Sequence, residues 1–157
     1  MLSPESLKKI DREIAKYPPG QQQSAVMAAL RIAQEEKGWL APETIEFVAG
    51  YLGMAPIAAQ EVATFYNMYN LQPVGKYKIT VCTNLPCTLM GAESAVEHLQ
   101  RKLGIGFGET TPDGRFTLKE GECMGACGDG PVATVNNVRM CAKLTPEEAD
   151  RILAGLE

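Results

Sequence analysis

Five cysteines, and the spacing of four of them, constrain this chain more than any other feature of its sequence. Four residues separate Cys82 from Cys87, three separate Cys123 from Cys127, and 35 residues lie between the two pairs. Cys141 stands apart. A disulfide framework is a poor explanation for these cysteines, because their number is odd and because the charged, amphipathic N-terminal segment resembles no secretory signal. Two closely spaced pairs instead indicate metal ligands, so the fold has to bring two distant segments together.

Two kinds of metal centre can be built from four thiolates. They can bind one zinc ion tetrahedrally, or hold the two irons of a [2Fe–2S] cluster, two per iron. Structural zinc sites most often use cysteines two residues apart; the wider gaps here favour a cluster whose sulfides accept hydrogen bonds from loop amides. The single histidine, His98, cannot supply the imidazole pair of a Cys2His2 finger or a Rieske centre. The spacing therefore favours an iron–sulfur cluster over a zinc ion, and either metal centre over a pair of reversible disulfides.

The first 70 residues predict helices only. Ser3-Pro4-Glu5, Pro42-Glu43 and Pro56 each begin a helix, because proline is tolerated at the first helical position. Another helix is predicted over about residues 21–37 and ends at Gly38. Short helices joined by short loops pack as a bundle. Residues 1–72 are therefore predicted to form a helical-bundle domain.

A mixed domain is predicted over residues 73–157, and its boundary with the helical bundle falls within the linker 71–75. From Tyr77 apolar residues alternate with polar ones, which predicts a strand that ends at Cys82. Asn136-Asn137 suits a tight hairpin, and Thr145-Pro146 begins a capped helix. The remaining elements are a helix over about 91–103 and strands over 115–120, 131–135 and 138–141. The predicted order is β-α-β-β-β-α, so the whole chain is of the α+β class.

Charge and hydropathy argue against two kinds of partner. With 15 Lys and Arg against 19 Asp and Glu, the net charge is -4, and no basic run could neutralise a phosphate backbone. The longest apolar stretch, residues 45–66, contains Glu46, Gly50 and Gly53 and cannot span a bilayer. We expect no nucleic-acid partner, no direct membrane insertion and a cytoplasmic location.

The segments around the cysteines resemble a known family. VCTNLPC and ECMGACGDGPVATVN, together with EVATFYNMYNLQPVGKYKITVCTNLPC and LTPEEADRIL, resemble the thioredoxin-like [2Fe–2S] ferredoxins. More narrowly, they are similar to the flavoprotein-associated, NuoE-type subunits of NADH:quinone oxidoreductase, respiratory complex I. The resemblance covers nearly the whole chain and implies a helical bundle followed by a thioredoxin-like [2Fe–2S] domain. It places the cluster ligands at Cys82, Cys87, Cys123 and Cys127.

The resemblance also implies a function. A partner flavoprotein subunit would bind NADH and FMN and take the hydride, and this chain would accept single electrons from the flavin through one [2Fe–2S] cluster. The helical bundle would dock the partner and the rest of the peripheral arm. Other subunits would hold the chain at the cytoplasmic face of the inner membrane. No nucleophile–base pair is evident, so we expect no NADH oxidation by this chain alone.

Several residues also have purely structural interpretations. Cys141, at the end of a strand, is expected to be a small core residue. Thr83, Asn84 and Leu85 are expected to be hydrogen-bond donors in the cluster loop, and His98 a surface residue. Phe65, Tyr66 and Tyr69 are predicted to form a helical stripe. Two alternatives to complex I remain open: the equivalent subunit of an NAD-linked hydrogenase or formate dehydrogenase, and a zinc-binding interaction domain.

Overall fold

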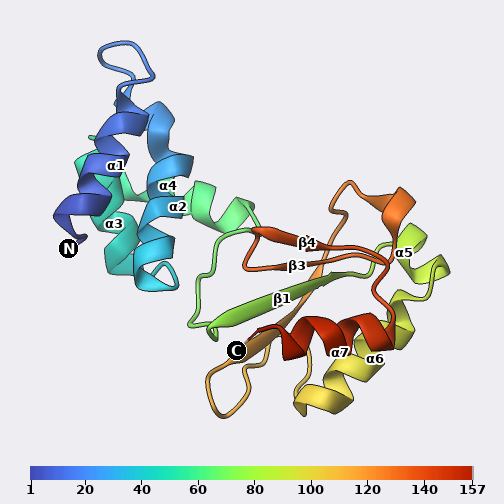
Figure 1. Cartoon of the computed structure of the whole chain (residues 1–157). Coiled ribbons are helices and arrows are strands. Elements are labelled where there is room, and N and C mark those ends of the chain that lie inside the picture. Colours follow the sequence, from blue (N-terminus) through green and yellow to red (C-terminus); the bar gives the residue numbers. More distant parts are fainter. Residues whose placement is uncertain (157) are drawn as a thin grey trace. The chain divides into compact units, whose positions relative to one another are not determined.

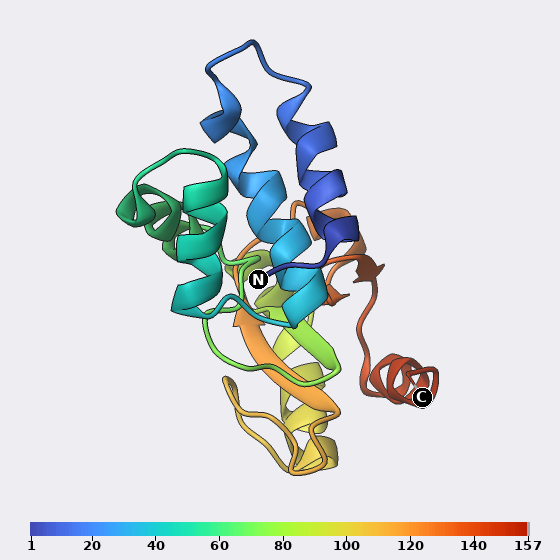
Figure 2. The same ribbon diagram turned by 90° about the vertical axis from the view of Figure 1, so that its left-hand side faces the viewer.

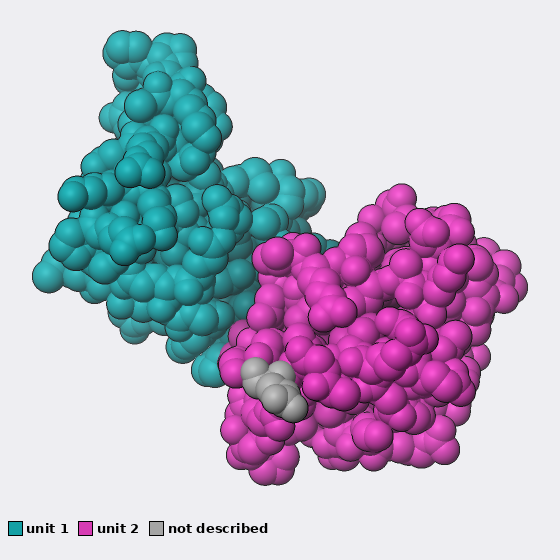
Figure 3. Space-filling view, viewed as in Figure 1, with its two compact units in different colours: residues 1–73 teal, residues 74–157 magenta. Residues whose placement is uncertain are grey.

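The chain folds as two units, Met1–Pro73 and Val74–Glu157, and the computed structural model describes residues 1–156 (Figures 1 and 3). The division falls within the segment 71–75. Each unit has its own buried apolar cluster. Within residues 1–156, no helix combines the length and the apolar character that crossing a bilayer requires.

The first unit consists of helices. They are α1 (Pro4–Ile14), α2 (Val26–Lys37), α3 (Pro42–Tyr51) and α4 (Pro56–Phe65). The Ser3 hydroxyl caps α1 by accepting a hydrogen bond from the Ser6 N–H, as the sequence predicts. Ile10, Leu30 and Val48 are completely buried at the centre of the unit. Figure 2 shows α1 and α2 lying side by side.

Two helical expectations differ from the structure. The helix predicted from about residue 21 begins with a 3-10 turn over Gln22–Ala25, and α2 starts only at Val26. The aromatic stripe is not helical throughout, because α4 ends at Phe65 and Tyr66 is already extended. Tyr69 instead folds back, so that its hydroxyl donates to the carbonyl of Met27 at 2.8 Å.

The second unit is a four-stranded sheet in the order β2-β1-β3-β4. Its strands are β1 (Tyr77–Cys82), β2 (Phe116–Gly121), β3 (Ala133–Val135) and β4 (Arg139–Cys141), with helices α5 (Leu85–Leu89), α6 (Ala92–Leu103) and α7 (Pro146–Ala154). β1 and β2 are parallel, and the other pairs are antiparallel. Helices α6 and α7 bury their apolar side chains in one cluster with those of the sheet (Figure 1). The α+β expectation is confirmed.

Local signals in this unit are also confirmed. Asn136 and Asn137 have φ values of 52° and 59°, the conformation that a tight β3–β4 hairpin requires. The Thr145 hydroxyl caps α7 by accepting from the Glu148 N–H. The short helix α5 was not predicted, because five residues carry too little periodicity to show a helix in the sequence.

His98 is not the isolated surface residue that the sequence suggests. Its Nε2 lies 2.8 Å from Oδ1 of Asp150, and Nζ of Lys102 lies 3.1 Å from the same oxygen. Because His98 is on α6 and Asp150 on α7, these polar contacts join the two helices that cover the sheet. The hydrogen bond from His98, followed by that from Lys102, lowers the pKa of Asp150.

The Asp150 interaction predicts a pH-dependent contribution to stability. A carboxyl whose pKa is lowered in the folded state stabilises that state above its ordinary pKa of about 4, and the contribution is lost as the pH falls through the lower folded value. Asp150→Asn should therefore lower the free energy of unfolding at pH 7, with a difference from wild type that shrinks below about pH 4. Urea denaturation over this pH range measures it, with Glu97→Gln on the exposed side of α6 as control. If the difference in the free energy of unfolding does not change with pH, the Asp150 carboxylate does not supply this contribution.

Candidate metal centre

Parallel pairing of β1 and β2 brings the two cysteine segments to one edge of the sheet. Cys82 is the last residue of β1 and lies in register with Gly121, the last residue of β2. Cys123 follows two residues after β2 ends. Since both strands run in the same direction, both cysteine segments leave the sheet at its carboxyl edge. The structure thus brings together the two segments that the sequence separates by 35 residues.

The four cysteines occupy different local structures and come together as two pairs. Cys87 lies on α5, and Cys127 begins a 3-10 turn over Cys127–Asp129, so neither lies in the open loop that the sequence suggests. Cys82 and Cys87 are each only 1% exposed and are hydrogen-bonded to one another. Cys123 and Cys127 are exposed and are also hydrogen-bonded to one another. The site therefore has one buried and one exposed pair of thiols.

Burial and neighbouring thiols disfavour the ionised forms of Cys82 and Cys127. Burial raises the pKa of Cys82, and the adjacent Cys87 raises it further, while the backbone N–H groups of Asn84 and Met124 donate to this sulfur and act in the opposite direction. The hydrogen bond with Cys123, and then its charge, raise the pKa of Cys127, and the charge of Cys82 adds to this effect. The influence of Cys82 on Cys127 links the two pairs. Such a cluster of soft donors requires bound cations to become a set of thiolates.

The surrounding backbone is built to approach the sulfurs closely. The N–H of Gly125 donates to Sγ of Cys123 at 3.3 Å. A Cβ at Gly130 would lie 3.0 Å from Sδ of Met90 and 3.6 Å from Sγ of Cys87. Glycine therefore allows the second loop to pass the first cysteine pair without crowding Met90 and the carbonyl of Cys127. Amide donors aimed at sulfur are the hydrogen bonds that iron–sulfur clusters use.

The donor set suits a binuclear centre. Four thiols in two contacting pairs match a [2Fe–2S] cluster, in which each iron takes two cysteines. Over residues 1–156, no group of three or more His, Cys, Asp or Glu side chains is arranged around a position for one metal ion.

Two side chains expected to act as loop donors have other partners. The Thr83 hydroxyl donates to Oε1 of Glu120 at 2.7 Å, and Nδ2 of Asn84 donates to Oε2 of Glu122 at 2.8 Å. Asn84 nevertheless directs its backbone N–H at the sulfur of Cys82. Sequence reasoning missed Glu120 and Glu122, since their contacts with the first loop arise from the pairing of β1 with β2.

Cys141 belongs to a different buried cluster from Cys82 and Cys87. It is buried on β4, opposite Ala133, within the apolar cluster between the sheet and the helices. Burial raises the pKa of its thiol, which keeps it protonated. The expectation that Cys141 is a small core residue is consistent with this position.

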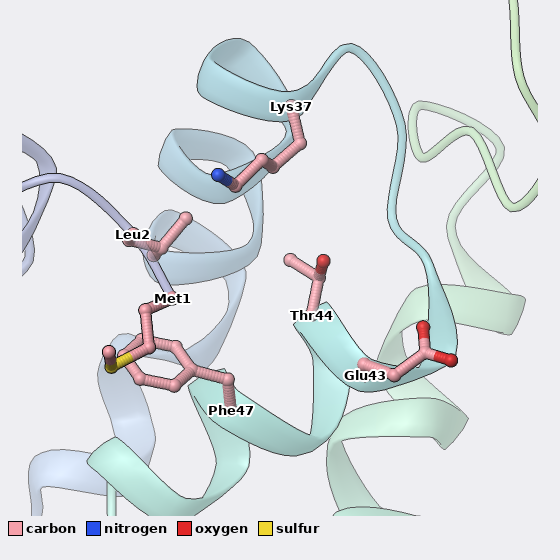
Figure 4. Close-up of a pocket in the computed structure, with 6 residues that line it drawn as sticks. All are labelled: Met1, Leu2, Lys37, Glu43, Thr44 and Phe47. Carbon is pink, nitrogen blue, oxygen red and sulfur yellow. The ribbon is translucent and has the colours of Figure 1, made fainter.

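The helical unit has a pocket of a different kind. It measures about 60 Å³ and is lined by Met1, Leu2, Lys37, Glu43, Thr44 and Phe47 (Figure 4). Ligand pockets typically measure about 300–1,000 Å³, so this space holds no more than a few waters. It contains no nucleophile–base pair. All five cysteines lie in the second unit.

Gly121 offers a direct test of how tightly the two cysteine segments are joined. A Cβ there would lie 2.5 Å from Cγ2 of Thr80, a side chain that is stiff at χ1, and 3.1 Å from Cε of Met124. Gly121→Ala should therefore lower the free energy of unfolding by about 1–3 kcal/mol and weaken metal retention. Gly128→Ala is the matched control, since nothing lies within 4 Å of its added Cβ. Equal stability of the two variants in chemical denaturation would refute the close packing.

Comparison with known proteins identifies the family. Residues 10–157 match the model of the thioredoxin-like [2Fe-2S] ferredoxin family. NADH-quinone oxidoreductase subunit 2 of Thermus thermophilus is 42% identical over 147 residues, which is 94% of this chain and 81% of that protein. An NADH-quinone oxidoreductase subunit of Rickettsia conorii is 46% identical over 145 residues, covering 92% of this chain and 86% of that protein.

A solved structure shows the same fold. The NAD+-reducing [NiFe]-hydrogenase in its air-oxidised state matches 81% of this chain with a TM-score of 0.68 and 20% identity, and the match spans 22% of the hydrogenase chain. At this identity the likeness concerns the fold alone. The family match, the relatives and the arrangement of the cysteine pairs agree: the chain belongs to the thioredoxin-like [2Fe-2S] ferredoxin family.

Proposed function

We propose that this chain is the electron-transfer subunit of an NADH:quinone oxidoreductase, complex I, and that it carries one [2Fe–2S] cluster. The observation that carries the proposal is the meeting of two cysteine pairs at one sheet edge, in a chain 42% and 46% identical to subunits of that enzyme. These relatives match over most of their length, which favours complex I over a hydrogenase or formate dehydrogenase. The donor set favours iron–sulfur over structural zinc.

Cys82 and Cys87 hold one iron in this proposal, and Cys123 and Cys127 hold the other. When bound, the cluster supplies one-electron redox chemistry. The protein excludes water from the buried pair and aims the N–H groups of Asn84, Met124 and Gly125 at sulfur. These dipoles stabilise negative charge at the site. The exposed pair leaves one side of the site accessible to a partner.

The partner is a flavoprotein subunit that binds NADH and FMN, together with the rest of the peripheral arm. Two exposed apolar surfaces support contact with other subunits. One is on α5, where Leu85 is 67% and Leu89 78% exposed beside the buried Cys87; the other includes Phe65 of α4, which is 81% exposed. Exposed apolar groups of this kind mark interaction sites. The helical unit is then the docking element, and other subunits hold the chain at the cytoplasmic face of the inner membrane.

Metal analysis combined with electron paramagnetic resonance tests the function. We expect two irons per chain and a rhombic signal that appears only on reduction. NADH should produce this signal only when the purified flavoprotein subunit is present, since this chain alone is not expected to oxidise NADH. A chain that holds one zinc and no iron would overturn the proposal, as would a reduced cluster that never exchanges electrons with the flavoprotein.

Serine variants test the ligand assignment. Cys82→Ser and Cys123→Ser each remove one thiolate, so each should lose the cluster or change its visible spectrum. Cys141→Ser is the matched control and should retain the cluster, because Cys141 lies in the apolar core of the sheet. Iron content and visible circular dichroism measure both effects. An unchanged spectrum in Cys82→Ser would exclude that residue as a ligand.

A further inference from the structure

Two carboxylates beside the second cysteine pair are held by side chains of the first cysteine loop. Thr83 donates to Glu120 at 2.7 Å, and Asn84 donates to Glu122 at 2.8 Å. The donors directly follow Cys82, and Glu122 directly precedes Cys123. A backbone hydrogen bond between the same segments, from the N–H of Thr83 to the carbonyl of Gly121, measures 3.1 Å. These three hydrogen bonds join the start of the first cysteine loop to the end of β2 and to the residue that follows it.

Asn84 makes this contact instead of a local one. It occupies the N-cap position of α5, where asparagine is among the preferred residues because its side chain can accept from the first turn of the helix. Its side chain forms no such capping bond, and its amide donates to Glu122 instead. The side chain thus makes a contact 38 residues away in the sequence at the cost of its usual cap.

We propose that Thr83, Asn84, Glu120 and Glu122 form a latch that positions the two cysteine loops and, through its two carboxylates, lowers the reduction potential of the cluster. The effect on the potential rests on the proposed function, whereas the hydrogen bonds of the latch are themselves observed. These are positioning residues, because they act through the loops and their charge and not as ligands.

The positioning role follows from the chemistry of the four side chains. A hydrogen bond to a carboxylate is stronger than one between neutral groups. It restrains loops that otherwise lose conformational entropy when metal binds. The latch thereby restrains the segments that carry Cys82 and Cys123 relative to one another. Opening the latch should therefore loosen the residues that follow Cys82, up to the start of α6.

The electrostatic role follows from the sign of the charges. Reduction adds one negative charge to a site that already contains four thiolates, and nearby carboxylates make that charge less favourable. Thr83 and Asn84 hold the carboxylates of Glu120 and Glu122 against the residues that directly follow Cys82. Both glutamates are exposed, so water and salt reduce the effect without removing it.

Two variants of the full chain separate these roles. Glu122→Gln removes the charge and keeps an oxygen that can accept from Asn84. Asn84→Ala removes the donor and keeps the charge. Glu97→Gln is the matched control, because it changes the net charge equally from an exposed position within α6. Glu122 is exposed, and Asn84, although partly buried, belongs to no apolar cluster, so neither latch variant removes a core contact.

Redox titration followed by electron paramagnetic resonance measures the potential. Glu122→Gln should raise the ratio of reduced to oxidised cluster at a fixed applied potential by about threefold or more, and Glu97→Gln should leave it unchanged. Asn84→Ala should release iron to a chelator faster than wild type. Amide hydrogen exchange over residues 83–91 should also be faster in metal-free Asn84→Ala than in the metal-free wild-type chain.

The proposal requires both the potential shift and the faster loop exchange. It is overturned if Glu122→Gln has the potential of Glu97→Gln, or if loop exchange in Asn84→Ala equals that of wild type. If Asn84→Ala lowers the potential with no change in exchange, the Asn84 side chain donates to the cluster and not to Glu122. Should the wild-type chain bind no iron, the proposed function fails, and exchange in the metal-free chains still decides whether the latch exists.

Discussion

Parallel pairing of β1 with β2 is the constraint on which the site depends. Because parallel strands need a crossover connection, the chain has to pass through α5 and α6 before it returns as β2. The register then places Cys82 opposite Gly121, so that the two cysteine segments leave the sheet together. Gly121 has no room for a side chain at this point. The backbone geometry of one strand pair thus builds the metal site.

The protein environment opposes ionisation of two of the paired thiols. Cys82 and Cys127 have raised pKa values, the first mainly through burial and the second mainly through its contact with Cys123. Cations bound at the site would favour the thiolate forms of these two residues. The dipoles of the backbone N–H groups favour negative charge at the site. The carboxylates of Glu120 and Glu122 in the latch are themselves negative and oppose it. The site therefore balances groups that favour and groups that oppose extra negative charge.

Much of the fold could be predicted because its signals are local. Alternation from Tyr77 predicts a strand, paired asparagines predict the β3–β4 hairpin, and Thr145 with Glu148 predicts the start of α7, all as observed. The misses concern short or long-range features. Helix α5 is too short to show a helical period, and the partner of His98 lies 52 residues away on another helix.

The sequence by itself determined the donor types, the spacing within each cysteine pair, the succession of helices and strands, and the family resemblance, because these depend on residues close together in the chain. Only the tertiary structure decided that the two pairs meet, and that the side chains of Thr83 and Asn84 bind Glu120 and Glu122. The physical reason is that strand register and helix packing bring together groups dozens of residues apart. Those contacts leave no periodic pattern in a single sequence.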